Sequence, residues 1–269
     1  MFINEYFTIM KRISIITMFS LIAMNFSLVQ DKEIDKLFKD FQSTEWGVVL
    51  QAKENLENME VKCIPGLIEM LKENSIKKLV NTGDLIYPGA EKFFGHGQII
   101  DYDIDKLDVR AGWLLEDLTF QNFGFTGIHI ERQGLNDFIK FNFPKYYNNT
   151  KNRQVIEKAT DKEKRDVIKK LSITAAQKWW ADEGNKWNRL DALINALSSD
   201  DEKRQAKALA YIRNGKSQCP NLTIEVYKSK IAPLINELAK SQLKRISEQA
   251  KLILVDTDFE WLKLKPTSN

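Results

Sequence analysis

The sequence predicts a mostly all-α protein of short stacked helix pairs, with one irregular loop insertion and a short strand pair. Three observations support this class. Apolar residues recur at helical spacing, prolines open two of the helical segments, and one block of sequence recurs after 41 residues. With 43% apolar residues the chain can bury a substantial core. We expect one domain over residues 31–269, with an insertion at 80–107 and an irregular segment at 124–150.

Residues 1–30 have the layout of a signal peptide. Lys11 and Arg12 precede ISIITMFSLIAM, an apolar run too short to span a bilayer comfortably, and polar sequence begins at Asp31. A retained anchor or a buried helix is the alternative. The abundance of lysine and asparagine beside this leader is typical of a bacterial protein. We therefore expect an exported chain, periplasmic or secreted, without a stable membrane span after cleavage.

The charge pattern indicates solvated helix faces rather than a polyanion-binding surface. A formal charge of +3 arises from 40 basic and 37 acidic residues, which alternate in stretches such as DKEIDKLFKD. This balance gives no case for nucleic acid as a partner. There is also no Walker loop, no GxGxxG motif and no metal-type cysteine spacing, so no cofactor is expected.

Helix signals mark three segments outside the recurring block: Asp31 to Phe41, Glu45 to Asn58 after a Ser43–Thr44 cap, and Asp161 to Ala181. The region after the last one contains Trp180 and Trp187, which lie seven residues apart. They would share one face if the helix continued through Gly184. We expect them to pack between helix pairs, and a stacking platform for a sugar or peptide stays open as the alternative.

The segment 124–150 shows a different pattern. Period-two apolar positions such as Ile128 and Ile130 are followed by an aromatic-rich irregular run. This pattern predicts a loop with a short strand pair.

The recurring block gives the strongest indication of architecture. LINALSSDDEKRQAKALAYI, from Leu193, aligns with LINELAKSQLKRISEQAKLIL, from Leu234, and an arginine recurs at Arg204 and Arg245. A third copy, LIEML at residues 67–71, is separated by the insertion from its arginine-led segment VRAGWLLEDL. The same unit is therefore expected three times.

Each unit is expected to form two helices. Residues 64–73 and 231–239 both begin with a proline in the first turn, where its missing N–H costs nothing. The linkers SSDDE and AKSQ then supply side chains that cap a second helix.

This arrangement resembles the HEAT-like family of α-solenoids, over roughly residues 43–79, 107–123 and 185–262. The chain departs from that family because only its last two copies follow each other directly. The resemblance implies a concave surface that binds a partner more often than it implies catalysis.

Two cysteines, Cys63 and Cys219, leave two alternatives open. They could form one disulfide in an oxidising compartment, or they could be separate buried thiols.

The insertion, NTGDLIYPGAEKFFGHGQIIDYDID at residues 81–105, is compatible with three kinds of site. Asp101, Asp103 and Asp105 could bind a metal ion, but the EF-hand spacing fails at the positions that need glycine and glutamate. A hydrolytic site would use His96 as base, with Asp84 or Asp101 to orient it. In the third reading the insertion is a binding or packing element.

We favour the third reading, because loops of this length in compact domains are usually functional and this one is rich in aromatic residues. Asp105 or Asp108 would then cap the helix near Val109, and Arg110 would pair with one of them. The predicted binding surface comprises Asp84, Tyr87, His96, Asp101, Tyr102, Asp103, Trp180 and Trp187.

The predicted role is therefore non-catalytic recognition of a protein or peptide partner, of a scaffold or immunity type. No catalytic residue and no metal ligand is assigned. The alternative is a hydrolase with a histidine–aspartate site in the loop at residues 81–108.

Overall fold

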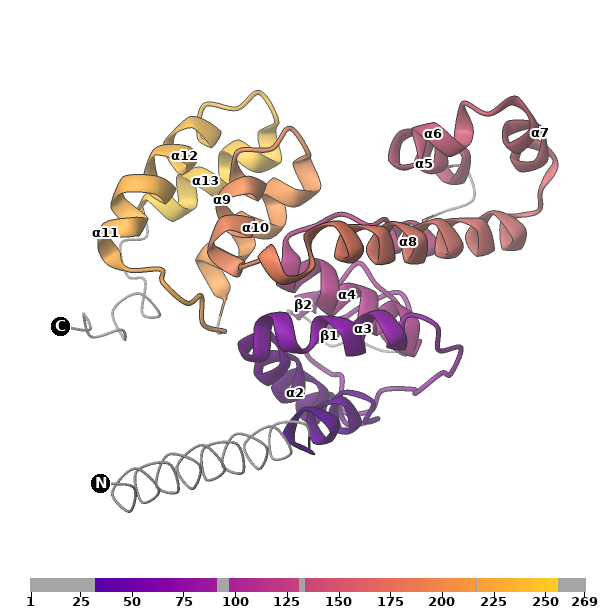
Figure 1. The fold of residues 1–269 in the computed structure, drawn as a ribbon, viewed down its shortest axis with the longest axis horizontal. Coiled ribbons are helices and arrows are strands. Elements are labelled where there is room, and N and C mark those ends of the chain that lie inside the picture. Colours follow the sequence, from indigo (N-terminus) through magenta and orange to yellow (C-terminus); the bar gives the residue numbers. More distant parts are fainter. Residues whose placement is uncertain (1–31, 91–96, 131–133, 216, 256–269) are drawn as a thin grey trace, which may run out of the picture.

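The computed structural model describes residues 32–90, 97–130, 134–215 and 217–255 (Figure 1). Over these residues the protein is mostly all-α, with one small two-stranded sheet, which confirms the predicted class. The expected signal peptide, residues 1–30, lies outside the described residues.

No helix in the described ranges combines the length and the apolar character that crossing a lipid bilayer requires.

The first part of the chain forms a helix at residues 32–41, followed by α2 (Trp46–Met59), η1 (Glu60–Lys62), α3 (Ile64–Met70), β1 (Leu85–Ile86), β2 (Gln98–Ile99), α4 (Leu107–Thr119) and η2 (Phe125–His129). The middle part forms α5 (Leu135–Asn142), α6 (Pro144–Tyr147), α7 (Thr150–Lys158), α8 (Asp161–Glu183) and η4 (Gly184–Lys186). The last part forms α9 (Arg189–Leu197), α10 (Glu202–Asn214), α11 (Ile224–Val226), the π-helical turn η5 (Tyr227–Ile231), α12 (Ala232–Leu238) and α13 (Lys244–Val255).

Helices form at the three places where the repeated block predicts pairs. Contacts join α3 to α4, α9 to α10, and α12 to α13. Pro65 and Pro233 lie in the first turns of α3 and α12. The Asp201 side chain caps α10 by accepting the N–H groups of Lys203 and Arg204, so this linker acts as expected.

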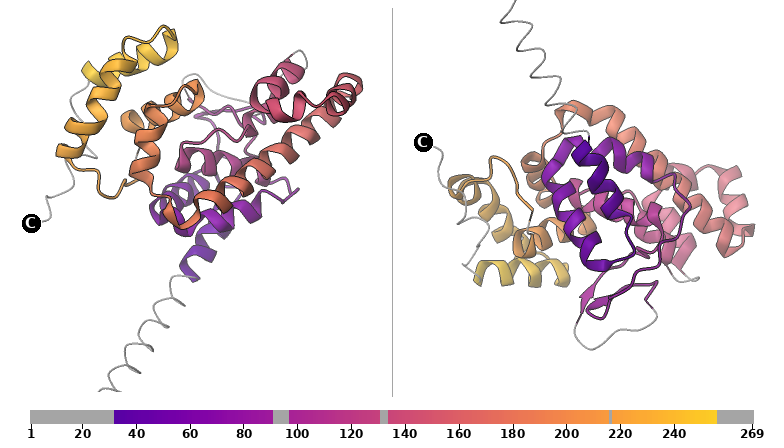
Figure 2. Two further views of the ribbon diagram at one scale, coloured as in Figure 1. Left: turned by 45° about the horizontal axis from the view of Figure 1, so that its top comes forward. Right: turned by 90° about the horizontal axis from the view of Figure 1, so that it is seen from below.

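Two apolar clusters divide the described chain. One gathers buried residues between positions 37 and 176, and the other gathers residues of α9 to α13 together with Phe120. We call residues 32–183 the N-terminal lobe and residues 189–255 the C-terminal lobe. Figure 2 shows α9 to α13 grouped beside the N-terminal lobe, and Trp187 packs against both clusters.

The prediction of a loop with a strand pair for residues 124–150 is wrong, because the described residues of this segment are mostly helical. Gly127 lies inside the 3-10 turn η2, and a side chain there would collide with the ring of Phe138. Leu135, Phe138 and Ile139 are buried at helical spacing, which places them on one face of α5. The strand pair forms instead in the insertion, where β1 and β2 pair in parallel.

The expected shared face of Trp180 and Trp187 is also wrong. Helix α8 ends at Glu183, and Gly184 turns the chain with a φ of +32°. The rings of Trp179 and Trp180 lie 5.9 Å apart, and both side chains pack against the N-terminal core. These tryptophans therefore pack between elements, as the first of the two readings expected.

Cys63 and Cys219 are both buried as separate thiols, and no disulfide joins them. The Cys63 Sγ donates to the backbone oxygen of Leu56 at 3.1 Å, and burial raises the pKa of this thiol well above its usual range.

Arg110 fixes the insertion to the helices that precede it. Its side chain is fully buried, and its guanidinium donates to the backbone oxygen atoms of Ile104 (2.6 Å), Phe41 (2.8 Å), Ser43 (2.9 Å) and Lys77 (3.0 Å). Burial lowers the pKa of Arg110 to about 10, so the group stays charged at neutral pH. The expected ion pair with a nearby aspartate is replaced by these carbonyl contacts.

Neither nearby aspartate caps α4: Asp105 holds the insertion, and Asp108 pairs with α8. The Asp105 carboxylate accepts the backbone N–H of Leu79 and the hydroxyl of Tyr87, both at 2.9 Å, and pairs with Lys78 at 3.2 Å. Asp108 pairs with Lys169 of α8 at 2.8 Å. Helix α4 begins without a side-chain cap, so that expectation is wrong.

We predict that Arg110→Met lowers the free energy of unfolding by about 3–5 kcal/mol, because several buried carbonyl groups lose their donor. Urea unfolding followed by circular dichroism measures this. Arg245→Met is the matched control, because Arg245 stands at the equivalent place of the last pair but is exposed. It should change the stability by less than about 0.5 kcal/mol. Equal losses in the two variants would contradict the anchoring role of Arg110.

Candidate binding groove

A cavity of about 1200 Å³ lies between the two lobes. The insertion, α2, α4 and η2 line it from the N-terminal lobe, and α10 and α13 line it from the C-terminal lobe. We call this cavity the groove. Its volume exceeds the range of about 300–1000 Å³ that is usual for small-molecule pockets.

One wall of the groove is apolar and comes from the insertion. Ile86 of β1 and Ile99 of β2 are register partners, so their side chains lie on the same face of the strand pair. Both line the groove together with Pro88, and Ile99 is 72% exposed. Leu85 lies on the opposite face and is fully buried. The strand pair therefore buries Leu85 in the core and presents Ile86 and Ile99 to the groove.

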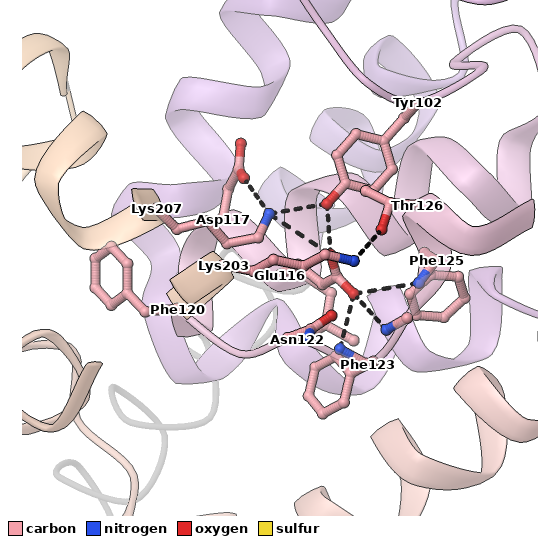
Figure 3. Close-up of polar contacts among 12 residues, drawn as sticks. Tyr102, Glu116, Asp117, Phe120, Asn122, Phe123, Phe125, Thr126, Lys203 and Lys207 are labelled. Atoms are coloured by element: carbon pink, nitrogen blue, oxygen red, sulfur yellow. Dashed lines mark hydrogen bonds and ion pairs between the residues drawn. The ribbon is translucent and has the colours of Figure 1, made fainter. Parts of the chain in front are cut away.

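The floor of the groove is an ion-pair network that joins three helices. Asp117 of α4 lies 3.2 Å from Lys53 of α2 and 3.1 Å from Lys207 of α10 (Figure 3 shows the second contact). Lys53 also pairs with Glu57 one turn further along α2, and its Nζ lies 4.8 Å from the ring centroid of Trp113. One carboxylate of α4 therefore connects the two lobes.

Glu116 lies next to Asp117 and is almost completely buried. Its Oε2 accepts the hydroxyl of Tyr102 and lies 3.5 Å from the Nζ of Lys207 (Figure 3). Its Oε1 accepts three backbone N–H groups, from Phe123 (2.8 Å), Gly124 (2.9 Å) and Phe125 (3.3 Å). A buried carboxylate with this many donors is fully satisfied and fixes the loop that follows α4.

The network holds its charged groups in fixed protonation states. Burial alone would lower the pKa values of Lys53 and Lys207, but the neighbouring carboxylates outweigh it and raise both. Burial would raise the pKa of Asp117, but the two ammonium groups outweigh it and lower that value. A general acid or base needs a pKa near the working pH, so these groups are poorly suited to proton transfer.

Lys203 lies one turn before Lys207 on α10 and lines the same groove. The contacts of its ammonium group differ from those of Lys207. Its Nζ donates to the hydroxyl of Thr126 at 3.1 Å and lies 4.7 Å from the ring centroid of Phe138. No carboxylate of the described residues forms an ion pair with it. Burial lowers its pKa.

A second polar contact set joins the lobes beside the groove. Arg189 is 1% exposed; its guanidinium donates to the backbone oxygen of Gln218 at 3.0 Å and lies 3.7 Å from the carboxylate of Glu57. The same carboxylate accepts the hydroxyl of Ser217. The Arg189 guanidinium also stacks 4.5 Å from the ring centroid of Tyr211.

The structure separates the residues of the predicted binding surface. Asp101 is exposed and lines the groove, whereas Asp84 is exposed without lining it. Tyr87 and Tyr102 line the groove but are 6% and 5% exposed, with hydroxyls engaged by Asp105 and Glu116.

Of the remaining predicted residues, Asp103 pairs with Lys106 at 3.0 Å. Trp180 and Trp187 pack against the core and do not line the groove. His96 lies outside the described residues.

Sequence reasoning missed the charged floor of the groove, which comprises Lys53, Glu57, Asp117, Lys203 and Lys207, and also the buried Glu116 that contacts Lys207 from behind it. One signal was available, since Glu116 and Asp117 interrupt an otherwise apolar stretch in GWLLEDL. Acidic residues in such a stretch usually have partners elsewhere in the fold.

Within the described part of the chain, no three His, Cys, Asp or Glu side chains gather in a way that could hold a metal ion. Comparisons of the chain with protein-family models, with curated proteins and with solved structures found no match.

We predict that Asp117→Asn changes how stability depends on pH. In the folded protein the pKa of Asp117 lies below its ordinary value of about 3.9. The stabilising contribution of this carboxylate is therefore complete above that ordinary value. It is lost as the pH falls through the pKa of the folded state. At pH 7 the variant should be less stable by about 1–3 kcal/mol, because two ammonium groups lose their shared partner.

The difference from the unaltered chain should shrink as the pH falls below about 4. Urea unfolding at pH 7, 5, 4 and 3 measures both effects. Asp182→Asn, at an exposed site on α8, should show neither. A difference that stays constant down to pH 3 would contradict the assignment.

Proposed function

We propose that this chain is a non-catalytic binding protein that takes an extended segment of a protein or peptide partner into the groove. The observation that carries the proposal is the groove itself, which sets an exposed apolar wall opposite a floor of fixed charges. A peptide offers apolar side chains, charged groups and backbone hydrogen-bonding groups along one extended chain, so it matches both surfaces.

The size of the groove supports a peptide over a small molecule. A volume of about 1200 Å³ is larger than drug-sized ligands usually require. Ile99 is the clearest apolar contact, because 72% of its surface is exposed where nothing in the described chain covers it.

The state of the charged groups supports binding rather than catalysis. The pKa directions of Lys53, Lys207 and Asp117 keep all three ionised at neutral pH, within ion pairs that the chain itself completes. The alternative hydrolase would depend on His96, which lies outside the described residues, so it stays a prediction. Export and a scaffold or immunity role also stay predictions.

The HEAT-like assignment belongs to this proposal. It is supported by the three helix pairs and by the position of the groove along α10 and α13, the second helices of two consecutive pairs. Solenoids bind their partners along such surfaces.

The function is tested by filling the groove. Ala210 of α10 is exposed and lines the groove, so Ala210→Trp should obstruct it without disturbing the core. The chain is immobilised and challenged with a displayed library of random linear peptides, and the affinities of selected peptides are then measured by fluorescence anisotropy. Ala210→Trp should weaken binding by about tenfold or more, because a bulky ring occupies the space of the ligand.

Ala181→Trp is the matched control, since Ala181 is an exposed alanine on α8 outside the groove. It should bind the selected peptides as the unaltered chain does. Failure to select any peptide, or equal binding by Ala210→Trp, would contradict the proposal. Deletion of residues 81–105 is a poorer test, because it removes Leu85 and Tyr87 from the core along with the groove wall.

A further inference from the structure

Building on the proposed function, we propose that the groove selects peptides that carry a carboxylate, which binds the ammonium group of Lys203. The apolar residues of the same peptide lie against Ile86 and Ile99. The ligand class is therefore an extended peptide in which apolar residues stand beside an acidic group.

The comparison among the three lysines of the groove carries this inference. Lys53 and Lys207 each contact carboxylates of their own chain, at distances of 3.2 Å and 3.1 Å from Asp117. Lys203 has a neutral hydroxyl and an aromatic ring as its contacts, although it is partly buried in the same cavity. A partly desolvated ammonium with only neutral contacts gains from a charge-assisted hydrogen bond.

The acidic groups around Lys203 are mostly engaged elsewhere. Glu116 is saturated by Tyr102, Lys207 and three backbone N–H groups. Asp201 caps α10 and accepts the side-chain amide of Asn122 at 3.2 Å. These carboxylates raise the pKa of Lys203, as does Asp101, but burial outweighs them.

Among the described acidic neighbours of Lys203, which are Glu116, Asp201 and Asp101, it is Asp101 whose side chain stays available. It is exposed on the insertion, it lines the groove, and no hydrogen bond or ion pair ties it to the described chain. It therefore acts as an internal competitor for Lys203. Removing its charge should favour an acidic ligand.

A second cation extends the basic side of the groove. Arg245, in the first turn of α13, is exposed and lines the groove without an ion pair in the described chain. The side formed by α10 and α13 therefore offers two cations that form no ion pair with a carboxylate of the described residues. The opposite wall is apolar, so a ligand has a preferred orientation across the groove.

The test uses peptides selected by the unaltered full chain from the random library. We expect these peptides to be enriched in aspartate or glutamate beside apolar residues. Lys203→Met keeps the apolar stem and removes the charge. This variant should lower the affinity for acidic peptides by about 10- to 100-fold. The affinity for their uncharged asparagine or glutamine analogues should not change.

Asp101→Asn should raise the affinity for the acidic peptides and leave the affinity for the uncharged analogues unchanged. Lys151→Gln is the control for general loss of positive charge, because Lys151 is exposed on α7 away from the groove. Selected peptides are measured with free and with amidated C-termini. This comparison distinguishes an acidic side chain from a terminal carboxylate as the group that binds Lys203.

The outcomes separate this inference from the proposed function. If no peptide is selected, the groove does not bind peptides and the proposed function fails. If peptides are selected and Ala210→Trp blocks them, but they show no acidic preference or bind Lys203→Met equally well, the inference about Lys203 is overturned alone. Circular dichroism and urea unfolding of each variant ensure that a loss of binding is not a loss of fold.

Discussion

The buried guanidinium of Arg110 is the interaction on which the rest of the structure depends. It donates to carbonyl groups from three separate segments of the chain. These are residues 41–43 at the end of the first helix, Lys77 before β1, and Ile104 before α4. Buried carbonyl groups need donors, so one planar group with several N–H bonds fixes these segments relative to each other. The described residues of the insertion are therefore a built part of the N-terminal lobe, and Ile86 and Ile99 are held at the groove.

Helix α4 transmits that constraint to the groove. Arg110 lies in its first turns, whereas Trp113 and Asp117 lie one and two turns later and both line the groove. The side chain of Glu116 leaves the helix about 100° around its axis from that of Asp117. It therefore faces the insertion and the loop after the helix instead of the groove. The same helix thus binds the insertion at both of its ends, and the half-buried Asp117 joins the two lobes.

Features that depend on residues close together in the sequence could be predicted, whereas contacts between residues far apart in the sequence could not. Helix pairs, first-turn prolines and the Asp201 cap depend on neighbours within a few residues, so periodicity and capping rules predict them. Residues 124–150 were misassigned because a short alternation at Ile128 outweighed the helical spacing of the residues after it. The candidate site was harder to foresee, since Lys207 and Asp117 are 90 residues apart and no local pattern brings them together. The composition of the insertion pointed to an important segment, but the partners of Asp105 lie far along the chain and are brought to it only by the fold.

The proposed role in ligand binding accounts for the charged floor of the groove better than a contribution to stability does. Taking ions out of water costs free energy, and well-packed apolar side chains at such positions often give a fold that is equally stable or more so. The N-terminal lobe already has a large apolar core, so it gains little from Lys53, Asp117 and Lys207 as cohesion alone. An apolar floor, however, would turn the groove into a continuous apolar surface of the kind that favours aggregation and unselective binding. In the proposed function, a floor of satisfied charges with Lys203 left to neutral contacts would allow the groove to discriminate among ligands by charge.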